Sequence, residues 1–362
     1  MPPPIIDTHI HLFPSSELSS LAWCSPDHPL AGQRSVSEYL AATATAGSSS
    51  SSSSQDDPPA SGGGGGGGGG GPLAGFVFVE TDRKNDESRD WAGPLQEVAW
   101  MRRLVTGQPR EGEGHSAEDA RLCLGMVPWA PVASGPAELE RYLEAAEKEA
   151  GPETWKRIKG FRYLLQDKPN EVALEEGFIE SLKLLGRKGF VFEVAIDQHR
   201  RGRMQLENAI EMINRAHEGV EDEHKVVFVL NHLCKPDLSI INQTDPSYVA
   251  WRAAMFAFSK CQKTYMKLSG CFSELPDKLK ERPAEDIFSA IIPWLAVVVA
   301  AFGPNRIMFG SDWPVCTVGV GEDAWKKWHK IVDMVCDLAG LSEKDQEMLW
   351  SGTAKQVYKL EA

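Results

Sequence analysis

The feature that most constrains the fold of this chain is a series of eight short apolar runs, each rich in β-branched or aromatic residues. They begin at positions 5, 74, 122, 158, 190, 225, 264 and 306, and amphipathic stretches such as AELERYLEAAEKEA follow them. Strands that alternate with helices pair in parallel through right-handed crossovers. We therefore predict one α/β domain over residues 1–362, a (β/α)8 or TIM barrel, with a doubly wound sheet as the structural alternative.

One segment interrupts this alternation. Residues 47–72 consist largely of serine and glycine, with almost no apolar side chains to bury. Such a composition predicts a disordered, flexible insert. It lies between the first helical segment and the second strand, so it is expected on the rim of the barrel opposite the strand ends that carry catalytic groups.

Charge and cysteine content exclude several classes of function. The formal net charge is −13 and no basic patch offsets it, which argues against nucleic acid and against an anionic membrane as partners. Seven cysteines lie far apart without a Cys-x-x-Cys pair, as expected for free thiols in a reducing compartment. The opening MPPPIIDTH lacks the features of a secretory signal. We expect a cytoplasmic protein that acts on a small molecule, and leave open whether it forms a homo-oligomer.

The first strand, IIDTHIHL, carries two histidines two residues apart. Residues i and i+2 of a strand point to the same face, so Asp7, His9 and His11 are predicted to share one face. Each polar group left unpaired in a buried position costs about 1–3 kcal/mol. Either neighbouring backbone satisfies these side chains, or the two imidazoles bind a cation.

Polar residues also gather where the other predicted strands end. Because the carboxyl ends of all strands of a barrel meet at one mouth, these side chains are expected to converge with the two histidines. They are Glu80, Asp82, Arg162, Glu193, His232 and Asp312.

These motifs resemble the amidohydrolase superfamily, in which His-x-His on the first strand accompanies an Asp that closes the eighth. The segments DTHIHL, NHLCKP, KLSG and GSDWPV resemble its lactonase branch, and the opening together with GFVFVETDRKN resembles fungal L-rhamnono-gamma-lactonases. The resemblance implies hydrolysis of a sugar-acid lactone, L-rhamnono-1,4-lactone or a related aldonolactone, to the open aldonate. A metal-dependent non-oxidative decarboxylase of the same superfamily is the alternative, and an inactive barrel used for binding is the third.

Lactone hydrolysis assigns roles to the residues of this pattern. Asp312 is the expected general base, with a helix N-cap as its structural alternative. His232 would polarise the carbonyl or protonate the leaving alkoxide. His9 and His11 would either hold a metal, together with Glu193 and Asp312, or donate hydrogen bonds to the oxyanion.

Two departures from the superfamily pattern bear on the metal. Lys159 lies too near the start of its strand to be the modified lysine that bridges two metals in many members. Glu193 stands where many members carry a histidine. We therefore expect one divalent metal, zinc in the first place, and leave open whether it is weakly bound or absent.

The remaining candidates are expected to bind the substrate. Arg162 would hold substrate oxygens through its guanidinium fork, or would form a buried ion pair with Glu193. Glu80 and Asp82 would bind sugar hydroxyls or face solvent. Aromatic side chains of the mouth would stack on the sugar ring or simply pack, namely Trp23, His28, Trp129, Tyr163 and Trp313.

Overall fold

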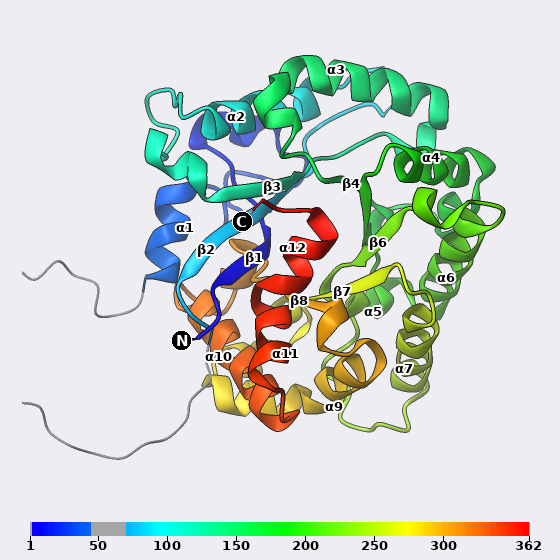
Figure 1. The fold of residues 1–362 in the computed structure, drawn as a ribbon. Helices are drawn as coiled ribbons and strands as arrows, with labels where there is room; N and C mark the ends of the chain where they lie inside the picture. Colours follow the sequence, from blue (N-terminus) through cyan, green and yellow to red (C-terminus); the bar gives the residue numbers. More distant parts are fainter. Residues whose placement is uncertain (1, 45–69, 88, 362) are drawn as a thin grey trace, which may run out of the picture.

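The structure, a computed structural model, describes residues 2–44, 70–87 and 89–361 (Figure 1). Each of the eight predicted runs contains a strand, which confirms the α/β expectation. Most of the predicted insert lies outside the described residues. The strands are β1 (Ile5–Ile10), β2 (Leu73–Val79), β3 (Cys123–Val127), β4 (Gly160–Leu164), β5 (Val191–Ala195), β6 (Val227–Leu230), β7 (Thr264–Leu268) and β8 (Ile307–Phe309).

Helices follow the strands and surround them. In Figure 1 the last helix, α12, lies across the ring of strands beside β1 and β8. The helices are α1 (Val36–Thr43), α2 (Ala92–Val105), α3 (Pro136–Trp155), α4 (Glu176–Arg187), α5 (Gln198–Arg201), α6 (Arg203–His217), α7 (Pro246–Ser259), α8 (Asp277–Lys280), α9 (Ala284–Phe302), α10 (Ala324–Leu338), α11 (Glu343–Glu347) and α12 (Thr353–Tyr358).

The strands close into a barrel. All neighbouring pairs are parallel, in the orders β1-β2-β3 and β4-β5-β6-β7-β8. Backbone hydrogen bonds join these two sheets at both seams: His11 N donates to Trp313 O at 2.7 Å, and Lys159 N donates to Met126 O at 2.9 Å. The predicted (β/α)8 architecture is therefore confirmed, and the doubly wound alternative is not what the chain forms.

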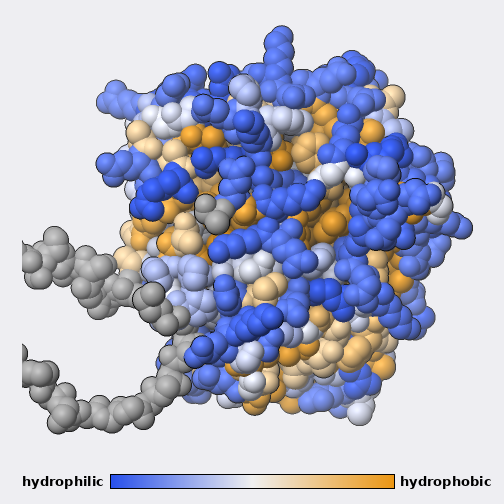
Figure 2. All heavy atoms as spheres, in the orientation of Figure 1, coloured by the Kyte–Doolittle hydropathy of each residue, from blue (hydrophilic) through white to orange (hydrophobic). Residues whose placement is uncertain are grey.

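Apolar side chains fill the half of the barrel in which the strands begin. Those of α12 pack there against inward-facing strand residues, which are Ile6, Val77, Val79, Val127, Val191, Val229 and Met308. The outer face that carries α12 and both termini shows mainly hydrophilic side chains between smaller apolar areas (Figure 2). Polar groups inside the barrel lie beyond this apolar layer, from the buried Glu193 within β5 and Lys267 within β7 to the end where the strands finish.

The described end of the predicted insert, residues 70–72, lies at the rim where the strands begin. Gly71 N donates to Pro3 O at 2.6 Å, just before the first residue of β1. The chain thus enters β2 at the amino ends of the strands, opposite the end that carries the polar groups, as expected for an αβ connection.

Helix α9 is long and apolar enough, by length and composition, to cross a membrane. One of its faces nevertheless belongs to the core, because Ile287, Ile291 and Val298 are fully buried. The Trp294 ring packs edge-on against Tyr248 of α7, with centroids 5.3 Å apart. This packing is that of a barrel helix.

The prediction that Asp7, His9 and His11 share one face is wrong, because β1 contains a bulge. Between Asp7 and Ile10 the strand advances three residues while its partner β2 advances two. The extra residue reverses the alternation, since each residue of a strand points opposite to the one before it. His9 and His11 face the barrel interior, whereas Asp7 faces the surrounding helices.

Asp7 ties the first strand to two helices. Its carboxylate is fully buried and accepts hydrogen bonds from Tyr39 Oη at 3.0 Å and Trp325 Nε1 at 2.9 Å, both on one oxygen, and from Ser311 N at 2.8 Å on the other. Asp7→Asn should lower the free energy of unfolding by about 1–3 kcal/mol, because an amide NH2 would then face two donors. Urea unfolding measures this, and an unchanged midpoint would contradict it.

Candidate active site

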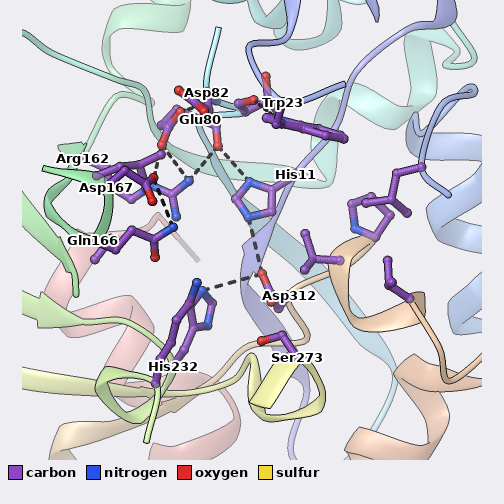
Figure 3. Close-up of a pocket in the computed structure, with 18 of the residues that line it drawn as sticks. His11, Trp23, Glu80, Asp82, Arg162, Gln166, Asp167, His232, Ser273 and Asp312 are labelled. Carbon is purple, nitrogen blue, oxygen red and sulfur yellow. Dashed lines mark hydrogen bonds and ion pairs between the residues drawn. The ribbon is translucent and has the colours of Figure 1, made fainter. Parts of the chain in front are cut away.

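The candidate catalytic residues meet around one carboxylate oxygen. Oδ1 of Asp312, which follows β8, lies 3.4 Å from His11 Nε2 and 3.7 Å from His232 Nε2 (Figure 3). His9 Nε2 also lies 3.7 Å from this oxygen. All four side chains are buried. The first strand and the residues after β6 and β8 thus bring three imidazoles to one carboxylate.

The backbone at these strand ends adopts left-handed conformations that non-glycine residues rarely adopt. Asp312 has φ +63°, and the four residues from His232 to Lys235 have φ of +53°, +55°, +62° and +46°. Such conformations cost on the order of 1–3 kcal/mol each and concentrate at functional sites. Asp312 does not cap a helix, because the next helical turn begins at Val315 with Pro314 before it.

The KLSG motif after β7 supports His232. Ser269 Oγ lies 2.9 Å from His232 Nδ1, and Gly270 has φ +64°. A Cβ at position 270 would overlap the His232 ring, so both the backbone angle and the space require glycine there. The motif therefore sets the orientation of an imidazole on the neighbouring strand.

Gly270→Ala should lower turnover about 100-fold, because a shift of the His232 ring by about 1 Å misplaces a reacting group. Gly303→Ala is the matched control: Gly303 also has a left-handed φ, +68°, but a Cβ there meets open space. Steady-state kinetics of both variants measure the difference. Equal activities would remove the supporting role of Gly270.

Protonation of the buried groups follows from their surroundings. Burial lowers the pKa of His9 well below its usual value and lowers that of His232 to about 3, so both rings are neutral near pH 7. Burial acts to raise the pKa of Asp312, but the neighbouring His232 and His11 rings hold it below its usual value. The site combines a carboxylate with neutral imidazoles.

The His11 ring has a defined orientation. Its Nδ1 lies 2.8 Å from Glu80 O and 3.0 Å from Val79 O, so this nitrogen carries the proton and donates it. The other ring nitrogen, Nε2, faces Asp312 Oδ1 at 3.4 Å, so a proton or a cation between or beside the two atoms would bind both.

A metal-binding group is present among the described residues. Donor atoms of His9, His232 and Asp312 all lie within 4.8 Å of one another and are buried. Imidazole nitrogen and carboxylate oxygen are ligands that zinc prefers in catalytic sites, where three protein ligands leave one position open. The donor set therefore fits one divalent ion.

His11 and Glu193, the other two predicted metal ligands, lie outside this group. Glu193 lies one layer below His9. Its oxygens face Lys267 Nζ at 2.6 Å, Tyr358 Oη at 2.6 Å and Asn231 Nδ2 at 2.8 Å, and His9 Nδ1 is 3.7 Å away. Donor groups of the protein therefore already bind the oxygens of the Glu193 carboxylate.

Lys267 is a functional candidate that the sequence reasoning missed. Its ammonium is fully buried and contacts Thr8 O at 2.6 Å and His9 Nδ1 at 3.2 Å as well as Glu193. Burial lowers the pKa of Lys267 to about 8, against the opposing effect of Glu193. A lysine in the middle of the apolar run TYMKL was the signal that could have identified it, since a buried charge needs a partner.

Arg162 pairs with Glu80 rather than with Glu193. Its Nη2 and Nε lie 2.6 and 2.7 Å from Glu80 Oε1, and its Nη1 is 3.4 Å from His9 Nε2. Arg162 and Glu193 are register partners on β4 and β5, but the guanidinium extends the other way, past the neighbouring β3, to the residue that follows β2. The predicted Arg162–Glu193 ion pair is therefore wrong.

A cavity of about 440 Å³ opens above Asp312 and is large enough for a small-molecule ligand. Figure 3 shows Trp23, Glu80 and Asp82 on one side and Gln166 and Asp167 beside Arg162. Predicted residues that line the cavity are His11, Trp23, His28, Glu80, Asp82, Arg162, His232 and Asp312. Lining residues without an assigned role in the sequence analysis include Gln166, Asp167, Lys235, Ser273 and Lys280.

Two predicted mouth residues differ in their surroundings. Asp82, with φ +54°, lines the cavity, and burial together with the Glu80 charge raises its pKa to about 7. Trp313 lies in the core instead, only 2% exposed, with its ring centroid 5.4 Å from that of Tyr39. Trp313 packs in the core cluster and does not line the cavity, so it is not placed to stack on a ligand.

Comparison with known proteins gives concordant results. A model of the amidohydrolase family matches residues 6–360. L-rhamnono-gamma-lactonase of Scheffersomyces stipitis is 29% identical over 98% of both chains, and L-fucono-1,5-lactonase of Burkholderia multivorans is 28% identical over 74% of this chain and 84% of that one. A solved structure of a Burkholderia multivorans amidohydrolase with bound zinc has a TM-score of 0.68 at 22% identity, covering 99% of this chain and 100% of the other.

Proposed function

The chain belongs to the amidohydrolase family, and from this premise we propose that it hydrolyses L-rhamnono-1,4-lactone to L-rhamnonate. It is a hydrolase of the lactonase type. The observation that carries the proposal is the carboxylate of Asp312, faced by three imidazoles at the floor of a cavity of about 440 Å³. The choice of sugar acid is supported by the relative that is similar over almost the whole chain.

The residues of the site can carry each step of ring opening. Asp312 removes a proton from a water molecule, whose oxygen adds to the ring carbonyl carbon while the carbonyl π electrons move to its oxygen. The intermediate collapses, the ring C–O bond breaks, and the leaving alkoxide takes up the proton. His232, buried and neutral, is placed beside Asp312 to pass that proton. The carboxylic acid product then ionises.

Sugar hydroxyls would be bound at the opposite wall of the cavity. Asp82 and Gln166 offer both donors and acceptors there, and Arg162 is fixed by Glu80 with one face toward the cavity. Trp23 presents its ring at the rim while its Nε1 donates to Thr81 O at 2.8 Å. An aromatic face beside fixed polar groups suits a polyhydroxylated ring of small size.

We further propose that one zinc ion is held by His9, His232 and Asp312. With His232 occupied by the ion, Asp312 itself would return the proton to the leaving alkoxide. Such an ion supplies Lewis-acid polarisation of the carbonyl and lowers the pKa of water. Zinc titrated into chelator-treated protein should bind at one ion per chain, and calorimetry measures this binding. His232→Gln should weaken that binding at least about tenfold, because the neutral amide oxygen of glutamine is a poorer zinc ligand than an imidazole nitrogen. Equal affinity of the variant would contradict this ligand assignment.

The proposed activity is tested directly with purified protein. L-Rhamnono-1,4-lactone, L-fucono-1,5-lactone and a set of aromatic acids are incubated separately, with acid release measured for the lactones and carbon dioxide for the acids. The expected result is the fastest acid release from the rhamnonolactone. Preference for the fuconolactone would change the substrate, and carbon dioxide release without lactone hydrolysis would replace the proposal by the decarboxylase alternative.

A further inference from the structure

Three cationic side chains line the cavity, and they differ in their partners. Arg162 is paired with Glu80 at 2.6 Å, and Lys280 is paired with Asp277 at 3.0 Å. In the part of the chain that the structure describes, the ammonium group of Lys235 makes no ion pair and no hydrogen bond. Lys235 thus brings a positive charge to the cavity that no anion among the described residues neutralises.

The backbone of Lys235 is firmly held. Its N–H donates to His232 O at 2.7 Å, and its carbonyl accepts from His199 N at 2.9 Å. Lys235 ends the run of left-handed residues that begins at His232, and both side chains line the cavity. This strained turn therefore serves two groups, an imidazole beside Asp312 and an ammonium beside the same space.

The charge of Lys235 reaches the catalytic carboxylate. Burial acts to raise the pKa of Asp312, and Lys235 is among the neighbours, after His232 and His11, that hold it down. Asp312 nevertheless forms no ion pair with Lys235 within the described residues, so the ammonium remains available to a ligand.

A lone cation suits a reaction in which negative charge appears only after the substrate is bound. A sugar lactone is neutral, whereas addition of water creates an oxyanion and ring opening leaves a carboxylate. A group that binds the later states but not the first one lowers the barrier without tightening substrate binding. A half-buried cation that already lines the cavity is positioned to do this.

We propose that Lys235 binds the negative charge that ring opening creates, first on the carbonyl oxygen and then on the product carboxylate. The inference rests on the proposed lactonase function and deepens it. It assigns the lysine of NHLCKP, which had no role, as a catalytic residue for an anionic transition state, and it predicts that the enzyme binds its acid product more tightly than a neutral polyol of the same size.

The test compares Lys235→Met and Lys235→Arg with Lys280→Met, a matched control that removes a cavity lysine already neutralised by Asp277. For the lactone, kcat and KM are measured, and calorimetry gives the Kd of L-rhamnonate. Lys235→Met should lower kcat about 100-fold, as loss of one oxyanion donor does, with KM little changed. It should weaken L-rhamnonate binding at least about tenfold. Lys235→Arg should restore part of both losses.

The control decides the outcome. Lys280→Met should stay within about threefold of the parent in both measurements, because an ion pair near the surface contributes little. If Lys235→Met matched Lys280→Met, the inference would be overturned while the lactonase activity of the parent protein stood. If the parent hydrolysed no lactone, the proposed function itself would fail. Lys235→Gln replaces the methionine variant if circular dichroism shows that the latter is unfolded.

Discussion

Asp312→Asn reduces lactone turnover about 10³-fold, because an amide cannot accept the proton of the attacking water, and general-base help is worth about 10²–10⁴ in rate. The change preserves the shape of a side chain that three imidazoles surround at 3.4–3.7 Å. We therefore expect the fold to persist. Steady-state rates and circular dichroism spectra of the parent and the variant measure the two effects separately.

A second carboxylate of the cavity provides the control. Asp167 lines the same cavity but lies beside Gln166 and Arg162 rather than among the histidines (Figure 3). Asp167→Asn removes one charge from the cavity in the same way and should affect KM more than kcat. Activity of Asp312→Asn close to that of the parent protein would remove Asp312 from the role of base.

Lys267→Met should lower the free energy of unfolding by about 3–5 kcal/mol, because it leaves a buried charge without its partner. The carboxylate of Glu193 is 0% exposed and lies 2.6 Å from the Lys267 ammonium. Hydrogen bonds from Tyr358 and Asn231 would remain, but neither carries a charge. Urea unfolding at neutral pH measures the loss.

The double variant Lys267→Met/Glu193→Gln separates a charge effect from a packing effect. Removal of both charges should recover a large part of the stability lost in the single variant, since the penalty comes from the unpaired ion. If the double variant were less stable than Lys267→Met, packing around the lysine stem would be the cause. A loss below about 1 kcal/mol in the single variant would show that the pair is not desolvated as the structure has it.

Features that depend on nearby residues could be predicted from the sequence. The eight strands follow from short apolar runs bounded by polar residues, which is a local property of the chain. That His9, His11, His232 and Asp312 approach one another follows from the barrel, because the ends of all its strands meet at one mouth.

Which charged side chains pair with each other depended on how the strands are arranged in the barrel. Arg162 and Glu193 are neighbours on adjacent strands, yet the structure pairs Arg162 with Glu80 and Glu193 with Lys267. Each of these side chains reaches past a neighbouring strand, from β4 to the residue after β2 and from β5 to β7. Inward-facing side chains of alternate strands lie in one layer of a barrel, and this layer decides which partner each charge finds. Sequence spacing holds no information about that choice.

The sequence by itself determined the alternation of strands and helices and the chemical types of the groups at the mouth, because hydrophobic periodicity and residue identity are properties of the chain alone. Only the tertiary structure decided that a bulge turns Asp7 outward, that Lys267 neutralises Glu193 and that the Lys235 ammonium lines the cavity with no partner within the described ranges. Each of these depends on distances between segments remote in sequence, and such distances are set by barrel closure and register.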